Sequence, residues 1–209
     1  MFILGIETSC DETAAGVLTV TRGKFIVRSN VVQSQIPIHR AYGGVVPEVA
    51  AREHVKNIIP VITAALKQAA VPLKKIDRIA VTRGPGLITA LLVGIETAKA
   101  LAWHQQIPIV GTNHLAGHVL VSQLDPHQPL TARDFPAVAL IVSGGHTELI
   151  LLRDAIHYQK IGATLDDAAG ECFDKVGKLL QVGYPGGPAV SHSAATGRAD
   201  KFQLPRPLL

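Results

Sequence analysis

The feature of this sequence that most restricts its fold is a strand–turn–strand pattern that occurs twice. The first copy has an apolar run at residues 2–6, a polar turn at 7–13 and a second apolar run at 14–20. The second copy has apolar runs at 137–142 and 149–152 on either side of the turn SGGHTE. Short apolar runs bounded by turn residues are typical of strands. Because each copy opens one half of the chain, we predict a duplicated domain.

Strand-like and helical segments alternate between the two copies. The predicted strands cover 24–32, 76–84 and 107–112, the last two of them buried, and the predicted helices cover 47–70 and 87–104. Pro60 should kink or split the first helix. The second helix is almost wholly apolar, so we expect it to be internal, with Trp103 in the core. This alternation predicts an α/β fold with a mostly parallel or mixed sheet.

A turn-rich segment at 125–136 separates the two halves. We therefore predict a first lobe at 1–132 and a second lobe at 133–209. After its hairpin, the second half has room for one helix at about 166–181, the turn YPGGP and a polar tail. A duplicate of the first lobe needs more strands and helices than this. The second lobe is therefore expected to be incomplete.

The composition narrows the class of protein. The chain carries 20 basic and 16 acidic residues, a formal charge of +4, and no basic run exceeds two residues. Such a mild positive field is compatible with a nucleic acid partner without requiring one. The chain has only two cysteines, and they are far apart in the sequence. This pattern does not indicate a disulfide framework and is typical of proteins from a reducing compartment. No apolar run has the length of a signal peptide core or a membrane span. We expect a cytoplasmic protein with no membrane partner.

His114 and His118 lie four residues apart in NHLAGH. On a helix this spacing stacks both imidazoles on one face, where they could bind one divalent ion. A capping histidine and a solvent-facing histidine are an equally good explanation of the spacing. The pattern of zinc proteases would place Glu directly after the first histidine, and here that residue is Leu115. Peptide hydrolysis by that mechanism is therefore unsupported.

Two turns carry residues that suit a binding site. In SGGHTE, Ser143, Gly144 and Gly145 could expose backbone N–H groups to a phosphate or carboxylate, although a plain hairpin turn is the simpler interpretation. The turn ETSCDET holds Asp11 and Glu12, which could assist a reacting group or could belong to a solvated loop. The acids of this turn should raise the pKa of Cys10, which argues against a cysteine nucleophile.

The segment DDAAGECFDK places Asp167, Glu171 and Asp174 along one stripe of a predicted helix. Like charges at this spacing repel each other. Acidic residues at the helix N-terminus are favoured there, but Glu171 and Asp174 lie deeper. A bound hydroxyl, amine or cation would explain them, and so would an exposed acidic face. YPGGP also has two interpretations: it could be a rigid turn, or its backbone could contact a ligand.

Taken together, these motifs resemble one family. The motifs that carry the resemblance occur in this order: GIETSCDET, YGGVVPE, GPGL, NHLAGH, LIVSGGHTEL, DDAAGECFDK and YPGGP. In order and interval they are similar to the tRNA N6-adenosine threonylcarbamoyltransferase family, formerly called O-sialoglycoprotein endopeptidase. The resemblance implies an actin/Hsp70/sugar-kinase-like (ribonuclease H-like) fold with two related lobes and a ligand cleft between them.

The resemblance also implies a reaction. In this family, the threonylcarbamoyl group of threonylcarbamoyl-adenylate passes to N6 of adenosine 37 in tRNAs that read codons starting with A. The enzymes work in complexes, which in bacteria contain a related inactive paralogue and a small ATPase. Family members are considerably longer than this chain, and their last part supplies an Asp to the metal site and an Asn to the nucleotide site. Neither has a counterpart here.

Site residues follow from the resemblance by position. His114 and His118 would be ligands of one divalent metal, usually iron, with zinc also an option, and the third protein ligand would be missing from this chain. The substrate site would be lined by Ile141, Val142, Ser143, Gly144, Gly145, Asp174 and Gly187. Glu12 and Asp11 would assist near the reacting carbamoyl group.

Three other functions are alternatives. The chain could be a noncatalytic subunit that binds a partner of the same complex. It could be a small-molecule kinase or ATPase of the same fold, although such kinases do not need a histidine pair. A metalloprotease would need a glutamate at position 115.

Overall fold

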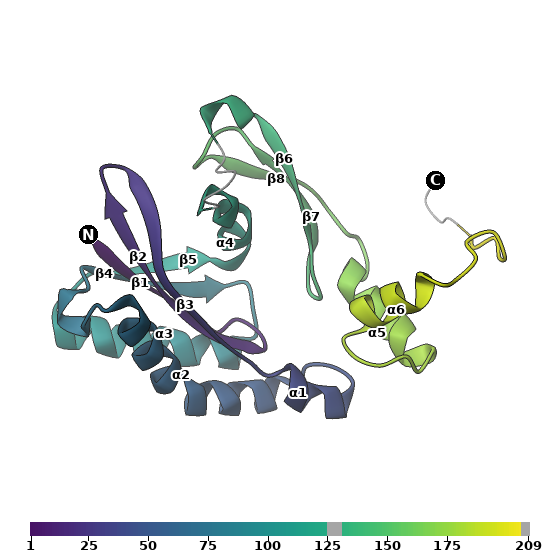
Figure 1. The fold of residues 1–209 in the computed structure, drawn as a ribbon, viewed down its shortest axis with the longest axis horizontal. Coiled ribbons are helices and arrows are strands. Elements are labelled where there is room, and N and C mark those ends of the chain that lie inside the picture. The colour runs from purple at the N-terminus through teal and green to yellow at the C-terminus, as the bar shows by residue number, and fades with distance from the viewer. Residues whose placement is uncertain (125–130, 206–209) are drawn as a thin grey trace.

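A computed structural model describes residues 1–124 and 131–205 of the chain. It contains two sheets of different size with helices beside them (Figure 1). The larger sheet has the order β3-β2-β1-β4-β5. Its strands are β1 (Phe2–Glu7), β2 (Glu12–Thr21), β3 (Lys24–Ser34), β4 (Arg78–Gly84) and β5 (Ile109–Asn113). β1, β2 and β3 pair antiparallel, whereas β4 runs parallel to both β1 and β5.

Two long helices, α2 (Pro47–Ala69) and α3 (Ile88–Gln105), lie against one face of the larger sheet (Figure 1). Side chains of a strand alternate between its two faces. Leu4 and Ile6 of β1 therefore point towards the helices and are buried there with Ile79 of β4. Proline suits the first turn of a helix, and α2 begins at Pro47 as predicted.

Parts of the helix predictions are wrong. Pro60 does not split α2, which runs unbroken to Ala69. α3 is internal on one side only, and Trp103 is 79% exposed rather than in the core. The reason is that α3 packs through its small residues, such as Ala98 and Gly94, which let its backbone approach the sheet. A Cβ atom at Gly94 would lie 2.5 Å from the Thr8 hydroxyl oxygen.

The prediction of a buried strand at 107–112 is also wrong. β5 forms one edge of the sheet, and Ile109 and Val110 are 40% and 44% exposed. An edge strand has a neighbour on one side only, so its apolar side chains are covered less completely.

The sheet face opposite α2 and α3 is lined by small residues, among them Gly5, Gly16 and Ala80. Val121 and Leu124, in a 3-10 turn after α4 (His114–Leu120), cover part of this face. A cavity of about 550 Å³ remains between that turn and the strands.

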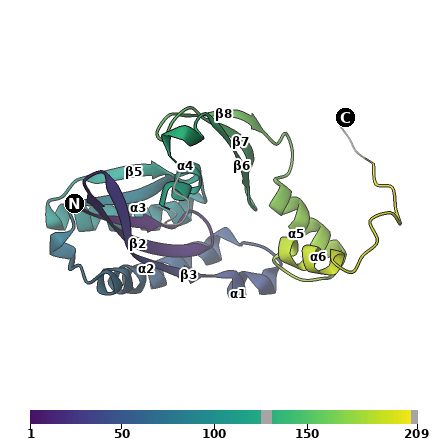
Figure 2. The ribbon, with the colours of Figure 1, turned by 45° about the horizontal axis from the view of Figure 1, so that its top comes forward.

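The smaller sheet has the antiparallel order β6-β7-β8, formed by β6 (Ala137–Val142), β7 (Thr147–Leu152) and β8 (Tyr158–Ala163). Ile141 and Ile150 pack with Val119 of α4, so this sheet packs against α4. Two helices come next, α5 (Ala169–Leu179) and α6 (Gly186–Ala194), and they pack together beside the hairpin of β6 and β7 (Figure 2). α1 (Ile36–His39) is a single turn between β3 and α2.

The predicted α/β fold is confirmed: the chain has one lobe built on a mixed five-stranded sheet and a shorter second unit. The lobe bounds at 132 and 133 stay a prediction, and residues 125–130 of the expected boundary lie outside the described residues. In the described part of the chain, no helix combines the length and apolar character needed to cross a membrane.

Candidate functional site

The candidate site forms where three neighbouring parallel strands end. β1 ends at Glu7, β4 ends at Gly84, and β5 is followed directly by His114. The carboxyl ends of parallel strands meet at one edge of a sheet, which is where ligands bind in open α/β folds. Residues that are far apart in the sequence are thereby brought together at this edge.

The two histidines lie on α4 as predicted. Asn113 caps this helix, because its side-chain oxygen accepts a hydrogen bond from the Ala116 N–H at 3.0 Å. The Nε2 atoms of His114 and His118 are 3.1 Å apart, with the rings edge to face. Burial, and then the neighbouring His114, lower the pKa of His118. Both effects favour the neutral imidazole, which is the form that binds a metal.

The Glu7 carboxylate lies behind this pair. Its Oε2 accepts hydrogen bonds from His114 Nδ1 at 3.1 Å and from the Thr82 hydroxyl at 2.6 Å, and its Oε1 accepts one from the Ser9 N–H at 2.5 Å. Burial by itself would raise the pKa of Glu7. The hydrogen bonds from His114, Ser9 and Thr82 outweigh burial and lower that pKa to about 2. The group is therefore a fixed anion at neutral pH.

The turn that carries Asp11 and Glu12 is held from two sides. The buried His54 of α2 contacts the Thr13 hydroxyl at 2.7 Å through Nδ1 and the Cys10 carbonyl oxygen at 3.0 Å through Nε2. A carbonyl only accepts, so Nε2 carries the proton and Nδ1 accepts from Thr13. On the other side, the Ser9 carbonyl accepts from the Leu87 N–H at 2.8 Å.

Asp11 is partly buried and Glu12 is exposed at the start of β2. Burial, and the negative charges of Asp11 and Glu7, raise the pKa of Glu12. A carboxylate with a raised pKa is a better proton acceptor. Burial and the charge of Asp11 raise the pKa of the Cys10 thiol to about 12, in the predicted direction, so this thiol stays protonated.

The glycine hairpin of the smaller sheet lies beside the histidine pair. Its tip is closed by the Ser143 N–H, which donates to the His146 carbonyl at 2.8 Å. The His146 ring centroid is 6.4 Å from that of His114. Gly144 and Gly145 are exposed, and a Cβ atom on either would meet no atom within 4 Å. Neither glycine has a positive φ, so the hairpin backbone itself does not require glycine at these two positions.

Ile141 and Val142 precede the hairpin on opposite faces of β6. Ile141 is buried against α4, whereas Val142 is 54% exposed. The Ile141 side chain therefore belongs to the core of the smaller sheet.

The acidic stripe is partly neutralised within the protein. Lys175 lies 2.6 Å from Asp167 and 3.1 Å from Glu171, which removes the repulsion expected from the sequence. α5 begins only at Ala169, so Asp167 precedes the helix. Asp174 accepts a hydrogen bond from the Gly186 N–H at 2.7 Å and so ties α5 to the start of α6.

The turn YPGGP leads into α6. Burial, followed by the charges of Asp11 and Asp174, raises the pKa of Tyr184 to about 12. Gly187, in the first turn of α6, has open space at its Cβ position.

The sequence model of the tRNA N6-adenosine threonylcarbamoyltransferase family (TsaD) matches residues 26–209. The chain belongs to this family. A relative of that name from Thermomicrobium roseum is 54% identical over 99% of this chain and 56% of its own length. Another from Geotalea daltonii is 53% identical over 100% of this chain and 59% of its own length. The chain thus spans a little over half the length of these relatives.

Among solved structures, YeaZ from Pseudomonas aeruginosa is similar in fold. It matches with a TM-score of 0.50 and 20% sequence identity, over 80% of this chain and 72% of that chain. At this identity the likeness concerns the fold alone.

The paired imidazoles of this threonylcarbamoyltransferase-family chain suit a divalent transition metal. Two nitrogen ligands at 2.0–2.1 Å from a tetrahedral ion lie roughly 3.4 Å apart, close to the separation of the two Nε2 atoms. Neutral imidazoles are good ligands for both iron and zinc. Within residues 1–124 and 131–205, no three His, Cys, Asp or Glu side chains converge on one point.

Sequence reasoning missed Glu7, Thr82 and His146 as members of this site. Glu7 was grouped with the acids of a turn, although it is the last residue of a strand. The signal that could have found it is the alignment of strand ends, because Glu7, Thr82 and His114 all lie at or near the carboxyl ends of neighbouring parallel strands.

Proposed function

We propose that this chain carries part of the active site for transfer of a threonylcarbamoyl group from threonylcarbamoyl-adenylate to N6 of adenosine 37 in tRNAs that read codons starting with A. The observation that carries the proposal is the position of the histidine pair beside the glycine hairpin, with His114 and His146 6.4 Å apart between ring centroids. Family membership supports the choice of reaction.

The proposed reaction exchanges one acyl bond for another. The N6 amine attacks the carbamoyl carbon of the adenylate and forms a C–N bond. The bond from that carbon to the phosphate oxygen breaks, AMP leaves with the electron pair, and N6 loses a proton. Glu12 would accept this proton, because burial and the charges of Asp11 and Glu7 raise its pKa and so make it a better proton acceptor. Asp11 would orient the amine.

Residues from the second lobe would hold the adenylate. Gly144 and Gly145 are exposed, and their backbone N–H groups would bind phosphate or carboxylate oxygens. Asp174, fixed by its bond from Gly186, would contact the ribose, and Gly187 would contact neighbouring groups. Ser143 and the backbone of Ile141 and Val142 would complete this wall.

His114 and His118 would hold one divalent ion, iron or zinc. When bound, such an ion polarises a carbonyl or phosphoryl oxygen and stabilises the charge that develops there. Two protein ligands leave room for a further ligand, which a longer relative could supply from its additional length.

The proposed partners follow from the same assignment. They are threonylcarbamoyl-adenylate, tRNA, a related inactive paralogue and a small ATPase, all in the cytoplasm.

The direct test is a transfer assay with purified chain, threonylcarbamoyl-adenylate and unmodified tRNA, with the partner proteins added. We expect modified adenosine, and we expect His114→Ala to lower the rate by about 100-fold or more, because an ion is worth several kcal/mol in such a step. His104→Ala is the matched control, since His104 is exposed at the end of α3. An undiminished rate with His114→Ala would remove the histidine pair from the mechanism.

A second candidate function is a noncatalytic subunit that binds a partner of the complex. It is favoured by one observation: within the described residues, the histidine pair has no third protein ligand. A chain that binds the partners in a pull-down but gives no modified adenosine with any metal supplied would support this alternative.

A further inference from the structure

Glu7 contacts the ring nitrogen of His114 that faces away from His118. We propose that Glu7 is a positioning residue, which fixes the tautomer of His114 and so aims its Nε2 lone pair at the point shared with His118. The inference deepens the proposed function and rests on the metal site assigned there.

The first step of the argument is that the carboxylate is itself fixed. The Ser9 N–H occupies Oε1 and the Thr82 hydroxyl occupies Oε2, at 2.5 and 2.6 Å. These donors come from the turn after β1 and from the neighbouring strand β4. The carboxylate therefore keeps its direction whether or not the imidazole is present.

The second step concerns the proton on His114. An ionised carboxylate only accepts hydrogen bonds, so the hydrogen between Oε2 and Nδ1 belongs to Nδ1. The Ser9 hydroxyl oxygen lies 3.1 Å from the same nitrogen and can share that hydrogen. A neutral ring protonated on Nδ1 has its lone pair on Nε2. Carboxylates placed behind metal-binding histidines act in this way and also raise the basicity of the ligand nitrogen.

The third step is that the two histidines are not equivalent. In the neutral ring protonated on Nδ1, His114 Nε2 only accepts, so the hydrogen between the two Nε2 atoms would come from His118. A metal needs the lone pairs of both nitrogens. His114 is therefore ready for the ion, whereas His118 must move its proton from Nε2 to Nδ1 when the ion binds.

Nitrogen-15 NMR of the histidine rings tests this assignment in the 209-residue chain. In the metal-free protein we expect His114 to be protonated on Nδ1 and His118 on Nε2. Addition of Zn²⁺ should change the tautomer of His118 and leave that of His114 unchanged. A metal-free His114 protonated on Nε2 would overturn the inference.

Variants separate the positioning role from the metal site itself. Glu7→Gln keeps the shape of the side chain and removes its charge, and we expect it to weaken Zn²⁺ binding by about 10–100-fold. Thr82→Val leaves Glu7 in place but removes a donor that fixes it, so we expect a smaller loss. Glu48→Gln, on an exposed residue of α2, should leave Zn²⁺ affinity unchanged. Circular dichroism checks that each variant is folded.

The outcomes distinguish two failures. If His114→Ala weakens Zn²⁺ binding but Glu7→Gln binds as tightly as the original chain, the positioning role is wrong and the metal site stands. If His114→Ala binds Zn²⁺ as tightly as the original chain, the metal site of the proposed function is wrong, and the inference falls with it.

Discussion

At the scale of single residues, buried polar side chains shape the candidate site. His54 is fully buried in α2, yet both of its ring nitrogens are hydrogen-bonded, to Thr13 and to the Cys10 carbonyl. It links the long helix to the turn that carries Asp11 and Glu12. The apolar periodicity of α2 could not reveal this role, because Val55 and Ile59, which belong to that periodicity, are 63% and 56% exposed, whereas the polar His54 is buried.

We expect His54→Ala to lower the free energy of unfolding by about 2–4 kcal/mol, since it leaves a cavity and two buried polar groups without partners. Burial lowers the pKa of His54, so its neutral form stabilises the fold fully above pH 6.5, the ordinary value. This contribution is lost as the pH falls below 6.5 towards the lowered pKa, where the unfolded chain binds more protons.

Urea denaturation of the original chain and of His54→Ala, at several pH values, measures both effects. The difference in stability between them should shrink as the pH falls below 6.5. His104→Ala is exposed and should change stability by less than about 0.5 kcal/mol. A difference that stays constant from pH 7 to pH 5 would contradict the assigned role of burial.

At the scale of elements, α5 packs against the hairpin of β6 and β7 through a close backbone contact. α5 begins beside the Ser143 carbonyl, which accepts from the Gly170 N–H at 3.1 Å. A Cβ atom at position 170 would lie 2.5 Å from that carbonyl oxygen. The glycine therefore permits the helix to start directly against the hairpin that would bind the substrate.

We expect Gly170→Ala to destabilise the fold by about 1–2 kcal/mol, because the backbone clash outweighs the better helix propensity of alanine. Gly44→Ala is the matched control, since nothing lies within 4 Å of its Cβ position and its φ is not positive. Thermal unfolding followed by circular dichroism compares the two. Equal melting temperatures for Gly170→Ala and the original chain would show that the hairpin and α5 do not need this contact.

At the scale of the whole molecule, the sequence predicted the main strands and helices but not the candidate site that they form together. Strand and helix patterns gave β1, β2, β4 and both long helices, since each depends on local periodicity. The site depends instead on contacts such as Glu7 with His114, which are 107 residues apart in the chain. Helical spacing singled out the two histidines, and the family resemblance gave them the role of metal ligands. The strand ends that align behind them became visible only in three dimensions.

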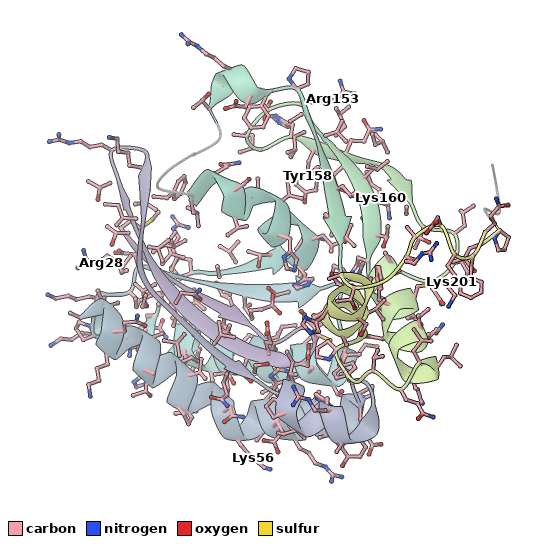
Figure 3. All side chains as sticks on the ribbon, turned by 45° about the vertical axis from the view of Figure 1, so that its right-hand side comes forward. Arg28, Lys56, Arg153, Tyr158, Lys160 and Lys201 are labelled. Carbon is pink, nitrogen blue, oxygen red and sulfur yellow. The ribbon has the colours of Figure 1, made fainter. Side chains whose placement is uncertain are left out.

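The basic side chains are also a property of the whole molecule. Arg28 lies in β3, Lys56 in α2 and Lys160 in β8, whereas Arg153 follows β7 and Lys201 follows α6 (Figure 3). The charge is thus spread, as the sequence indicated, and a tRNA partner is proposed from the family rather than from a basic patch.

The central claim is that an ion held by His114 and His118 lies next to the glycine hairpin. Paramagnetic NMR with Co²⁺ tests it most directly in the intact chain. Co²⁺ should shift or broaden the amide signals of Gly144 and Gly145 along with the rings of both histidines, and Gly197, beyond the end of α6, should be much less affected. Unchanged glycine signals at a Co²⁺ concentration that saturates the histidines would contradict the account.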